Sequence, residues 1–61
     1  LQIIEQLPQG YKTVFNLYAV EGYSHKDIGD MLNISAVTSR SQYSRAKKQI
    51  IELLKKYGVS R

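Results

Sequence analysis

Residues 25–45, HKDIGDMLNISAVTSRSQYSR, decide the fold of this chain. Ile28, Leu32 and Ile34 are spaced so that two residues of one helix and one residue of the following turn meet over a small core. Asn33 falls in that turn, where the backbone needs a left-handed conformation that Asn tolerates best after Gly. The stretch therefore predicts two short helices joined by a tight turn, which is a helix-turn-helix spanning about 24–45.

Residues at the two predicted helix starts support this assignment. Ser24 and Asp27 form a predicted capping box for the first helix, and Ser35 supplies an N-cap for the second. Gly29 lies where the second helix would cross closely, so a bulky side chain there would collide. We expect Gly29→Ala to be tolerated or even stabilising, because Ala is the better helix former by about 1 kcal/mol, and Gly29→Leu to overpack the crossing.

The length and composition of the chain narrow the function classes. At 61 residues, 1–61 is one domain with little room for a catalytic cleft, so an enzyme is the least supported class. The chain has no Cys, which excludes a disulfide framework and a thiolate zinc site, and we expect no metal and no cofactor. No apolar run approaches the roughly 20 residues that span a bilayer, and no signal segment is present, so we expect a soluble, cytoplasmic protein with no membrane partner. Because the chain lacks an initiating Met, we expect a domain cut from something longer.

The positive charge is concentrated in the second half of the chain. Residues 1–33 carry two lysines against four carboxylates, a net charge of −2, whereas residues 34–61 carry seven Lys and Arg against Glu52, a net charge of +6. A surface polarised in this way attracts polyphosphate. A solvated helix face that is merely basic is the alternative. Because the basic helix follows a helix-turn-helix, the pattern favours a nucleic acid partner.

Periodicity predicts an all-α fold of four helices, at 1–6, about 8–21, about 25–32, and 36 to 56 or 57, with no strand and no winged element. Pro8 separates the first two helices, and Gly22 is a plausible left-handed end of the second. The second helix has an amphipathic stripe. Its predicted buried residues are Tyr11, Val14, Phe15 and Tyr18, with Leu17 at the edge, and those of the fourth helix are Ser39, Tyr43, Ala46, Ile50 and Leu53 or Leu54.

The opposite face of the fourth helix is the predicted DNA-binding surface. The N-terminal part of the second helix of a helix-turn-helix enters the major groove, where Arg40 could hold guanine in bidentate fashion and Val37 or Thr38 could meet a thymine methyl group. Further along, Arg45 and the lysines would lie near the phosphate backbone, and the start of the third helix could hold a phosphate. The predicted DNA-contacting set is Ser24, Lys26, Ser35, Ala36, Val37, Thr38, Arg40, Ser41, Ser44, Arg45, Lys47 and Lys48.

The chain from Leu7 to about Leu54 resembles region four of bacterial sigma factors, specifically the extracytoplasmic-function group. The matching residues are Leu7, Pro8, Val14, Phe15, Leu17, Glu21 and Gly22 before the helix-turn-helix, and Ser24, Ile28, Leu32, Ile34, Ser35, Thr38, Ser41, Arg45 and Ala46 within it. The resemblance implies that the fourth helix recognises the −35 promoter element and that the flap of the RNA polymerase β subunit holds the domain. Leu17 and Val20, at the edge of the buried stripe, are the candidate polymerase contacts.

Three departures from the family pattern limit what the resemblance transfers. Ser39 stands where most members have Val, and Tyr43 where Leu is usual, so we expect an exchange of core volume that the fold survives. Ala36 and Val37 stand where Glu and Gly are frequent, which leaves the DNA sequence preference open. The chain also contains no region two, the part that reads the −10 element and melts DNA in this family. We therefore expect that it could not start transcription alone.

His25 and the tyrosines are expected to be structural. His25, the only His, is expected to be an exposed polar residue at a helix start with no catalytic or metal role. Tyr11, Tyr18 and Tyr43 fit the core, whereas Tyr23 and Tyr57 lie at helix ends and could cover it.

Two other function classes remain open. One is a protein-interaction module in which the helix-turn-helix no longer binds DNA and the first two helices bind polymerase or an anti-sigma factor. The other is the output domain of a two-component response regulator, which usually lacks the Leu-Pro break and the Arg-Ala pair at Arg45 and Ala46.

Overall fold

A computed structural model describes residues 2–58 as a set of helices joined by short turns, with no strand in that range. Its elements are α1 (Gln2–Glu5), α2 (Gln9–Phe15), the π-helical turn η1 (Asn16–Val20), α3 (His25–Leu32) and α4 (Ala36–Lys56). The all-α fold and the helix-turn-helix predicted from sequence are confirmed.

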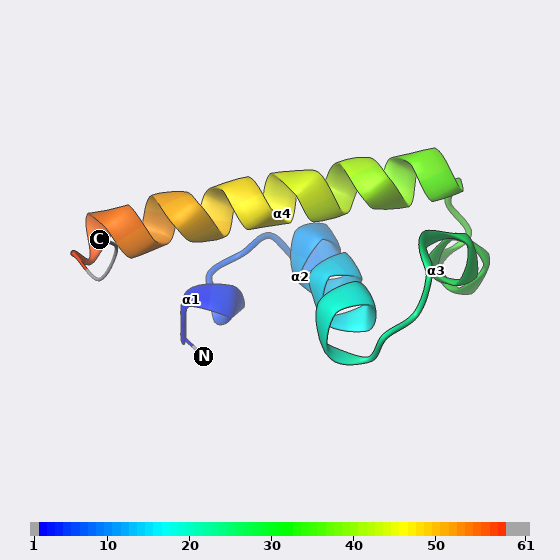
Figure 1. Cartoon of the computed structure of the whole chain (residues 1–61), viewed down its shortest axis with the longest axis horizontal. Helices are drawn as coiled ribbons and strands as arrows, with labels where there is room; N and C mark the ends of the chain where they lie inside the picture. The colour runs from blue at the N-terminus through cyan, green and yellow to red at the C-terminus, as the bar shows by residue number, and fades with distance from the viewer. Residues whose placement is uncertain (1, 59–61) are drawn as a thin grey trace.

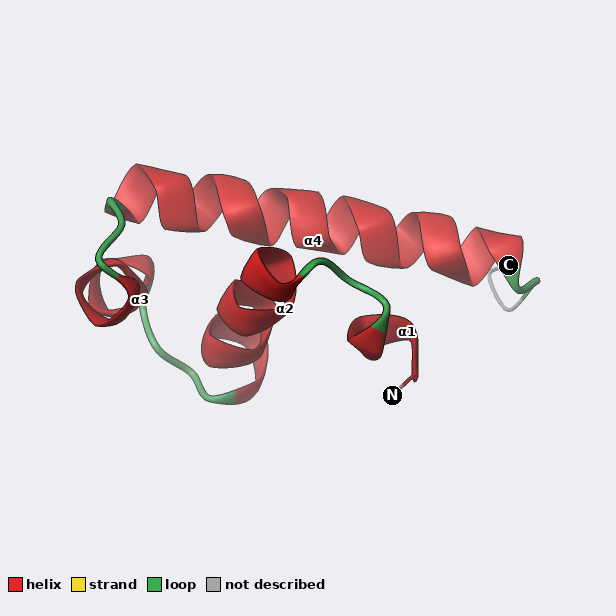
Figure 2. Cartoon of the chain, turned by 180° about the vertical axis from the view of Figure 1, so that it is seen from behind, coloured by secondary structure: helices red, strands yellow, loops and turns green. Residues whose placement is uncertain are grey.

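One long helix, α4, organises the molecule. It has 21 residues and runs along the longest of the three molecular dimensions, which are 37, 18 and 18 Å. The other helices lie along one side of it, with α2 and α3 against its N-terminal half and α1 nearer its C-terminal end (Figure 1). The same order is seen from behind (Figure 2). Because the short helices all use one side of α4, none of the described helices covers its opposite side.

The core is a line of small contacts between α4 and the short helices. Ile28 and Ala46 have no exposed surface, and Val14 and Leu7 are 1% and 5% exposed. The predicted inward stripe of α4 is confirmed where Ser39 and Ala46 are buried, while its remaining members are only half-buried. Leu32 departs from the prediction, because it is 36% exposed. It is the last residue of α3.

The second predicted helix changes its hydrogen-bonding pattern halfway along. After Phe15 the chain continues as η1, and the Glu21 amide donates to the Asn16 carbonyl over 2.9 Å, a bond that spans five residues rather than four. A wider turn rotates the side chains that follow it relative to the ordinary helical period. Within this turn Tyr18 is 38% exposed, although it was predicted to be buried, and Val20 is 67% exposed.

Two residues in the left-handed conformation end helices, as the sequence predicts, one after η1 and the other after α3 in the helix-turn-helix. Gly22 has a φ of 86° after η1, and Asn33 has φ and ψ of 60° and 45° after α3. The Asn33 amide donates to the carbonyl of Gly29, which closes the last turn of α3. These residues reverse the chain within a few positions and so bring the starts of α3 and α4 close together.

Serine side chains cap both helices of the helix-turn-helix. The Thr38 amide donates to Ser35 Oγ over 3.0 Å, and the Asp27 amide donates to Ser24 Oγ over 3.1 Å. Among the described residues no bond returns from the Asp27 carboxylate to the Ser24 amide, so the predicted capping box is only half formed. The Asp side chain is one methylene shorter than the Glu that completes such a box.

Gly29 packs against the backbone of the turn, and this corrects the expectation that Ala would be tolerated there. A Cβ atom at Gly29 would lie 2.5 Å from the Ile34 carbonyl oxygen and 3.4 Å from the Ala36 nitrogen. A backbone atom cannot move aside as a side chain can, because the Ile34 amide is itself bonded to the Gly29 carbonyl over 2.9 Å. The position therefore requires Gly because of the turn, and not because of side chains at the helix crossing.

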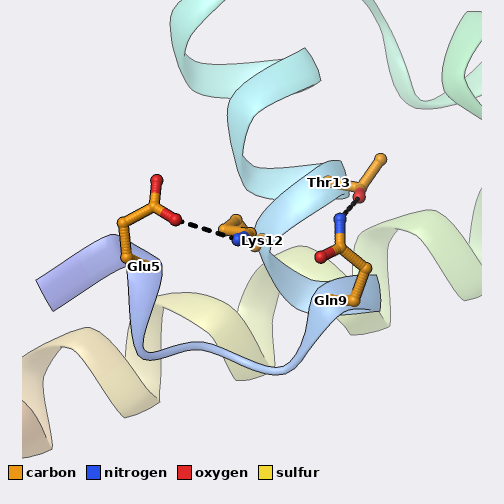
Figure 3. Close-up of polar contacts among 4 residues, drawn as sticks. All are labelled: Glu5, Gln9, Lys12 and Thr13. Carbon is orange, nitrogen blue, oxygen red and sulfur yellow. Dashed lines mark hydrogen bonds and ion pairs between the residues drawn. The ribbon is translucent and has the colours of Figure 1, made fainter. Parts of the chain in front are cut away.

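Polar contacts fasten the first helices to each other (Figure 3). Lys12 Nζ lies 3.1 Å from Glu5 Oε1 and so links α2 to α1 across the Pro8 break. Within α2, Gln9 Nε2 donates to Thr13 Oγ1 over 3.1 Å. These bonds lie on the surface and stabilise the fold only modestly.

Candidate nucleic-acid interface

The side of α4 that faces away from the short helices carries the side chains predicted to contact DNA. Val37 is 62% exposed, and positions 41, 44 and 48 follow it at helical spacing on the same side, opposite the buried Ser39 and Ala46. Most of these groups are short, so the helix can approach another surface closely. We call the exposed side chains of Val37, Thr38, Arg40, Ser41, Ser44, Arg45, Lys47 and Lys48 the recognition face.

A hollow of about 640 Å³ adjoins this face where the starts of α3 and α4 meet. We call it the junction hollow. Ser24 and Lys26 line it from the start of α3, and Ala36 and Arg40 from the first turns of α4. Its remaining lining residues are Tyr18, Gly22, Tyr23 and His25.

Two helix N-termini border the junction hollow, which makes its electrostatic character positive. The serine caps accept the amides of Asp27 and Thr38, and the amides that precede them in each first turn have no partner within their own helix. Free amides and the helix dipole favour an anion at such an end. Arg40 and Lys26 add full positive charges to the same wall.

The basic side chains around the site are only lightly engaged within the protein. Lys26 Nζ lies 3.8 Å from Asp30 Oδ2, with both side chains at least 74% exposed, so this pair is weak and easily exchanged. Lys47 Nζ lies 5.2 Å from the centre of the Tyr43 ring, a cation–π distance.

Some predicted site residues occupy different places from those expected. Ala36 is half-buried and lies beside Gly29 and the junction hollow, so it is not part of the outward face. The hydroxyl of Ser35 donates to Thr38 Oγ1 over 2.9 Å, and therefore both side chains also serve the N-cap of α4. Of the two candidate polymerase contacts, Leu17 is half-buried and Val20 is exposed.

His25 corrects the expectation of an exposed polar residue. Its Nδ1 lies 2.8 Å from Ser39 Oγ, and its ring stacks on Tyr18 with centroids 4.1 Å apart and planes at 6°. Tyr43 approaches the same ring at a centroid distance of 5.8 Å. Burial, and then the positive charge of Arg40, lower the pKa of His25 below its ordinary value of 6.5.

Sequence reasoning missed four lining residues of the junction hollow, namely Tyr18, Gly22, Tyr23 and His25. Three of them could have been found from their position in the sequence, because residues 22, 23 and 25 flank Ser24, the cap of the first helix of the helix-turn-helix. Tyr18 carried no such signal, since the π-helical turn that contains it is not evident in the periodicity.

Neither a metal centre nor a membrane span is found in the part of the chain that the structure describes. Residues 2–58 contain no group of three or more His, Cys, Asp or Glu side chains placed to hold a metal ion. Within the same residues, no helix combines the length and the apolar character needed to cross a bilayer.

Comparisons with known proteins identify the family. Among protein-family models, Sigma-70, region 4 matches residues 1–50, which include all of α1, α2, η1 and α3 and more than half of α4. Comparisons with curated proteins and with solved structures found no match. The matched segment contains the recognition face and the junction hollow, and the family is a DNA-binding one rather than a catalytic one. The chain therefore belongs to the Sigma-70, region 4 family.

Proposed function

We propose that this chain is the −35-binding domain of a sigma factor of the extracytoplasmic-function group, acting in the bacterial cytoplasm on double-stranded promoter DNA. The recognition face enters the major groove, where Arg40 contacts guanine and Val37 or the methyl group of Thr38 contacts thymine. The junction hollow receives a backbone phosphate beside Ser24 and Lys26.

One observation carries this proposal. On the N-terminal half of α4, the side turned away from the core presents short side chains and Arg40 at helical spacing, all of them exposed. A helix that packed a partner protein there would be expected to carry larger apolar groups. The separation of charge along the chain supports the same conclusion, because six of the basic residues lie on α4.

The contact with RNA polymerase is proposed for an apolar surface outside the recognition face. Val20 is 67% exposed at the end of η1, and it does not line the junction hollow. We propose the flap of the β subunit as that partner, with an anti-sigma factor as a competitor for the same apolar surface. Val20→Asn, which makes the surface polar without adding charge near the junction hollow, should weaken polymerase association and leave DNA affinity unchanged.

The DNA proposal is tested by selecting a preferred site from random duplexes and then comparing single substitutions. Arg40→Ala should cost about 1 to 3 kcal/mol on the selected site and relax the preference at one base pair. Lys48→Ala should weaken binding to all duplexes alike. It should also lower, by about one unit, the slope of the logarithm of the binding constant against the logarithm of the salt concentration. Lys55→Ala, which removes the same charge from an exposed position two helical turns further on, is the matched control and should change neither quantity.

Three outcomes would contradict parts of this assignment. Equal loss of affinity on all sequences after Arg40→Ala would make Arg40 a phosphate contact. Selection that returns no preferred sequence, with polymerase binding intact, would favour the protein-interaction module. Nanomolar binding by the isolated chain that hardly changes with salt would point to a self-sufficient repressor. A single copy that contacts DNA through the N-terminal half of α4 should instead bind weakly and gain occupancy from a tethered neighbour on polymerase.

A further inference from the structure

We propose that His25 is a positioning residue of the DNA site that binds a proton when duplex DNA occupies the junction hollow, an inference that rests on the proposed function. His25 has no role in the predicted contacts of this domain. The structure nevertheless places its ring at the point where η1, α3 and α4 meet, on the wall of the junction hollow.

The first part of the argument is the link between the two helices of the helix-turn-helix. Ser39 has no exposed surface, and its hydroxyl needs a hydrogen-bonding partner that His25 Nδ1 provides at 2.8 Å. The flat stacking of His25 on Tyr18 and the tilted contact with Tyr43 hold the imidazole from two further sides. Ser39 and Tyr43 are the two core departures from the family pattern, and both contact this one ring. His25 therefore fixes the position of α4 relative to α3.

The second part is the charge that surrounds the ring. From α4, Arg40 disfavours a positive charge on His25, while Tyr43 and the Ser39 hydroxyl are neutral. From η1, only the neutral Tyr18 faces it. On α3 itself, Lys26 and Asp27 follow directly, and the Lys26 Nζ lies 3.8 Å from Asp30 Oδ2. The start of α3 also disfavours a cation, because the helix dipole is positive there.

Duplex DNA would change the charge around His25 in the direction that favours protonation of its ring. Phosphates bring negative charge to the junction hollow, and base or phosphate oxygens bound by Arg40 neutralise the charge that repels a proton from the ring. Nδ1 is engaged with Ser39, and among the described residues no partner is bonded to Nε2. Protonated imidazole donates from both nitrogens, so the bond to Ser39 survives. Because linkage is reciprocal, uptake of a proton on binding means that DNA affinity rises as the pH falls.

A direct test uses the single His of the chain. Its ring proton resonances, followed by NMR in phosphate-free buffer, report one titration without interference from other imidazoles. In the free chain the midpoint should lie below 6.5, and in the complex with the selected duplex it should be higher. A midpoint that stays the same or falls on binding would overturn the inference. The measurement needs no variant, so it stands even if a substitution at His25 prevents folding.

The matching binding experiment measures affinity by anisotropy between pH 8 and pH 5.5. The natural chain should gain about threefold to tenfold over this range, whereas His25→Gln, which keeps a hydrogen-bonding side chain but cannot titrate, should gain much less. Thermal melts at each pH confirm that both proteins are folded. Equal pH slopes in the two proteins, or weaker binding by the natural chain at low pH, would leave His25 with a structural role only. Absence of binding at every pH would instead contradict the proposed function itself, and the inference with it.

Discussion

The two halves of α4 are held in different ways. Near its start, Gly29 lies against the backbone of the turn, Ile28 and Ser39 are fully buried, and His25 bonds across the helices. Near its end, α4 meets only the four-residue helix α1 among the described elements, and the exposed hydroxyl of Tyr57 reaches Gln6 over 3.3 Å. The N-terminal half of α4, where DNA is proposed to bind, is thus tightly packed, and the C-terminal half is less so. This suits a surface that must present a few side chains at a defined angle.

The largest expected effect comes from comparing two isoleucines, Ile28 of α3, which packs beside the N-terminal half of α4, and Ile51 in the C-terminal half of α4. Ile28→Ala should destabilise the domain by about 2 to 5 kcal/mol, because the side chain is fully buried and its removal leaves a cavity. Ile51→Ala on the C-terminal half of α4 should change stability by less than about 1 kcal/mol, since that side chain is 51% exposed. Urea unfolding followed by circular dichroism measures both. Similar losses at the two positions would show that the halves of α4 are equally well packed.

Gly29 and Gly10 form the next pair. Gly29→Ala should cost about 1 to 3 kcal/mol, because the new Cβ would meet the Ile34 carbonyl oxygen at 2.5 Å and the gain in helix propensity is smaller. Gly10→Ala is the matched control, since its nearest neighbour is the movable end of Gln42 at 3.3 Å, and it should be neutral or stabilising by up to about 1 kcal/mol. If the Gly29→Ala protein had a melting temperature equal to or above that of the unsubstituted protein, the Ile34 carbonyl oxygen would not lie this close to Gly29.

A smaller effect is expected at the cap of α4. Ser35→Ala should cost about 1 kcal/mol, because the Thr38 amide then loses its side-chain acceptor. Ser44→Ala, an exposed serine in the same helix, should change stability by no more than about 0.5 kcal/mol. Thermal melts of the two variants give the comparison. If Ser44→Ala were the more destabilising variant, the Ser35 cap would not be a significant source of stability for α4.

The smallest effect is expected at the far end of the molecule. Tyr57→Phe removes the 3.3 Å hydrogen bond to Gln6, which is exposed and exchanges readily for a bond to water. The free energy of unfolding should change by less than about 0.5 kcal/mol. A loss above about 1 kcal/mol would mean that α1 and the end of α4 are joined more firmly than their exposure indicates.

The sequence by itself determined the features that depend on neighbouring residues. Ser24 and Ser35 cap helices, Asn33 and Gly22 adopt the left-handed conformation, and the outward side of α4 follows from its period, because each depends on a few adjacent positions. The same reasoning found the recognition face, which requires only that one side of α4 be buried.

Only the tertiary structure decided the features that join distant parts of the chain. Tyr18 of the π-helical turn stacks on His25, and His25 in turn bonds to Ser39, fourteen positions further along the chain. Over a shorter span, Gly29 is required because the Ile34 carbonyl oxygen, five positions further on, lies 2.5 Å from where its Cβ would be, a distance that helical periodicity does not encode. Periodicity assigns a side chain to a face of its own helix, but which group it meets there depends on how the helices pack, and this is why sequence reasoning expected His25 to be exposed and Ala to be acceptable at Gly29.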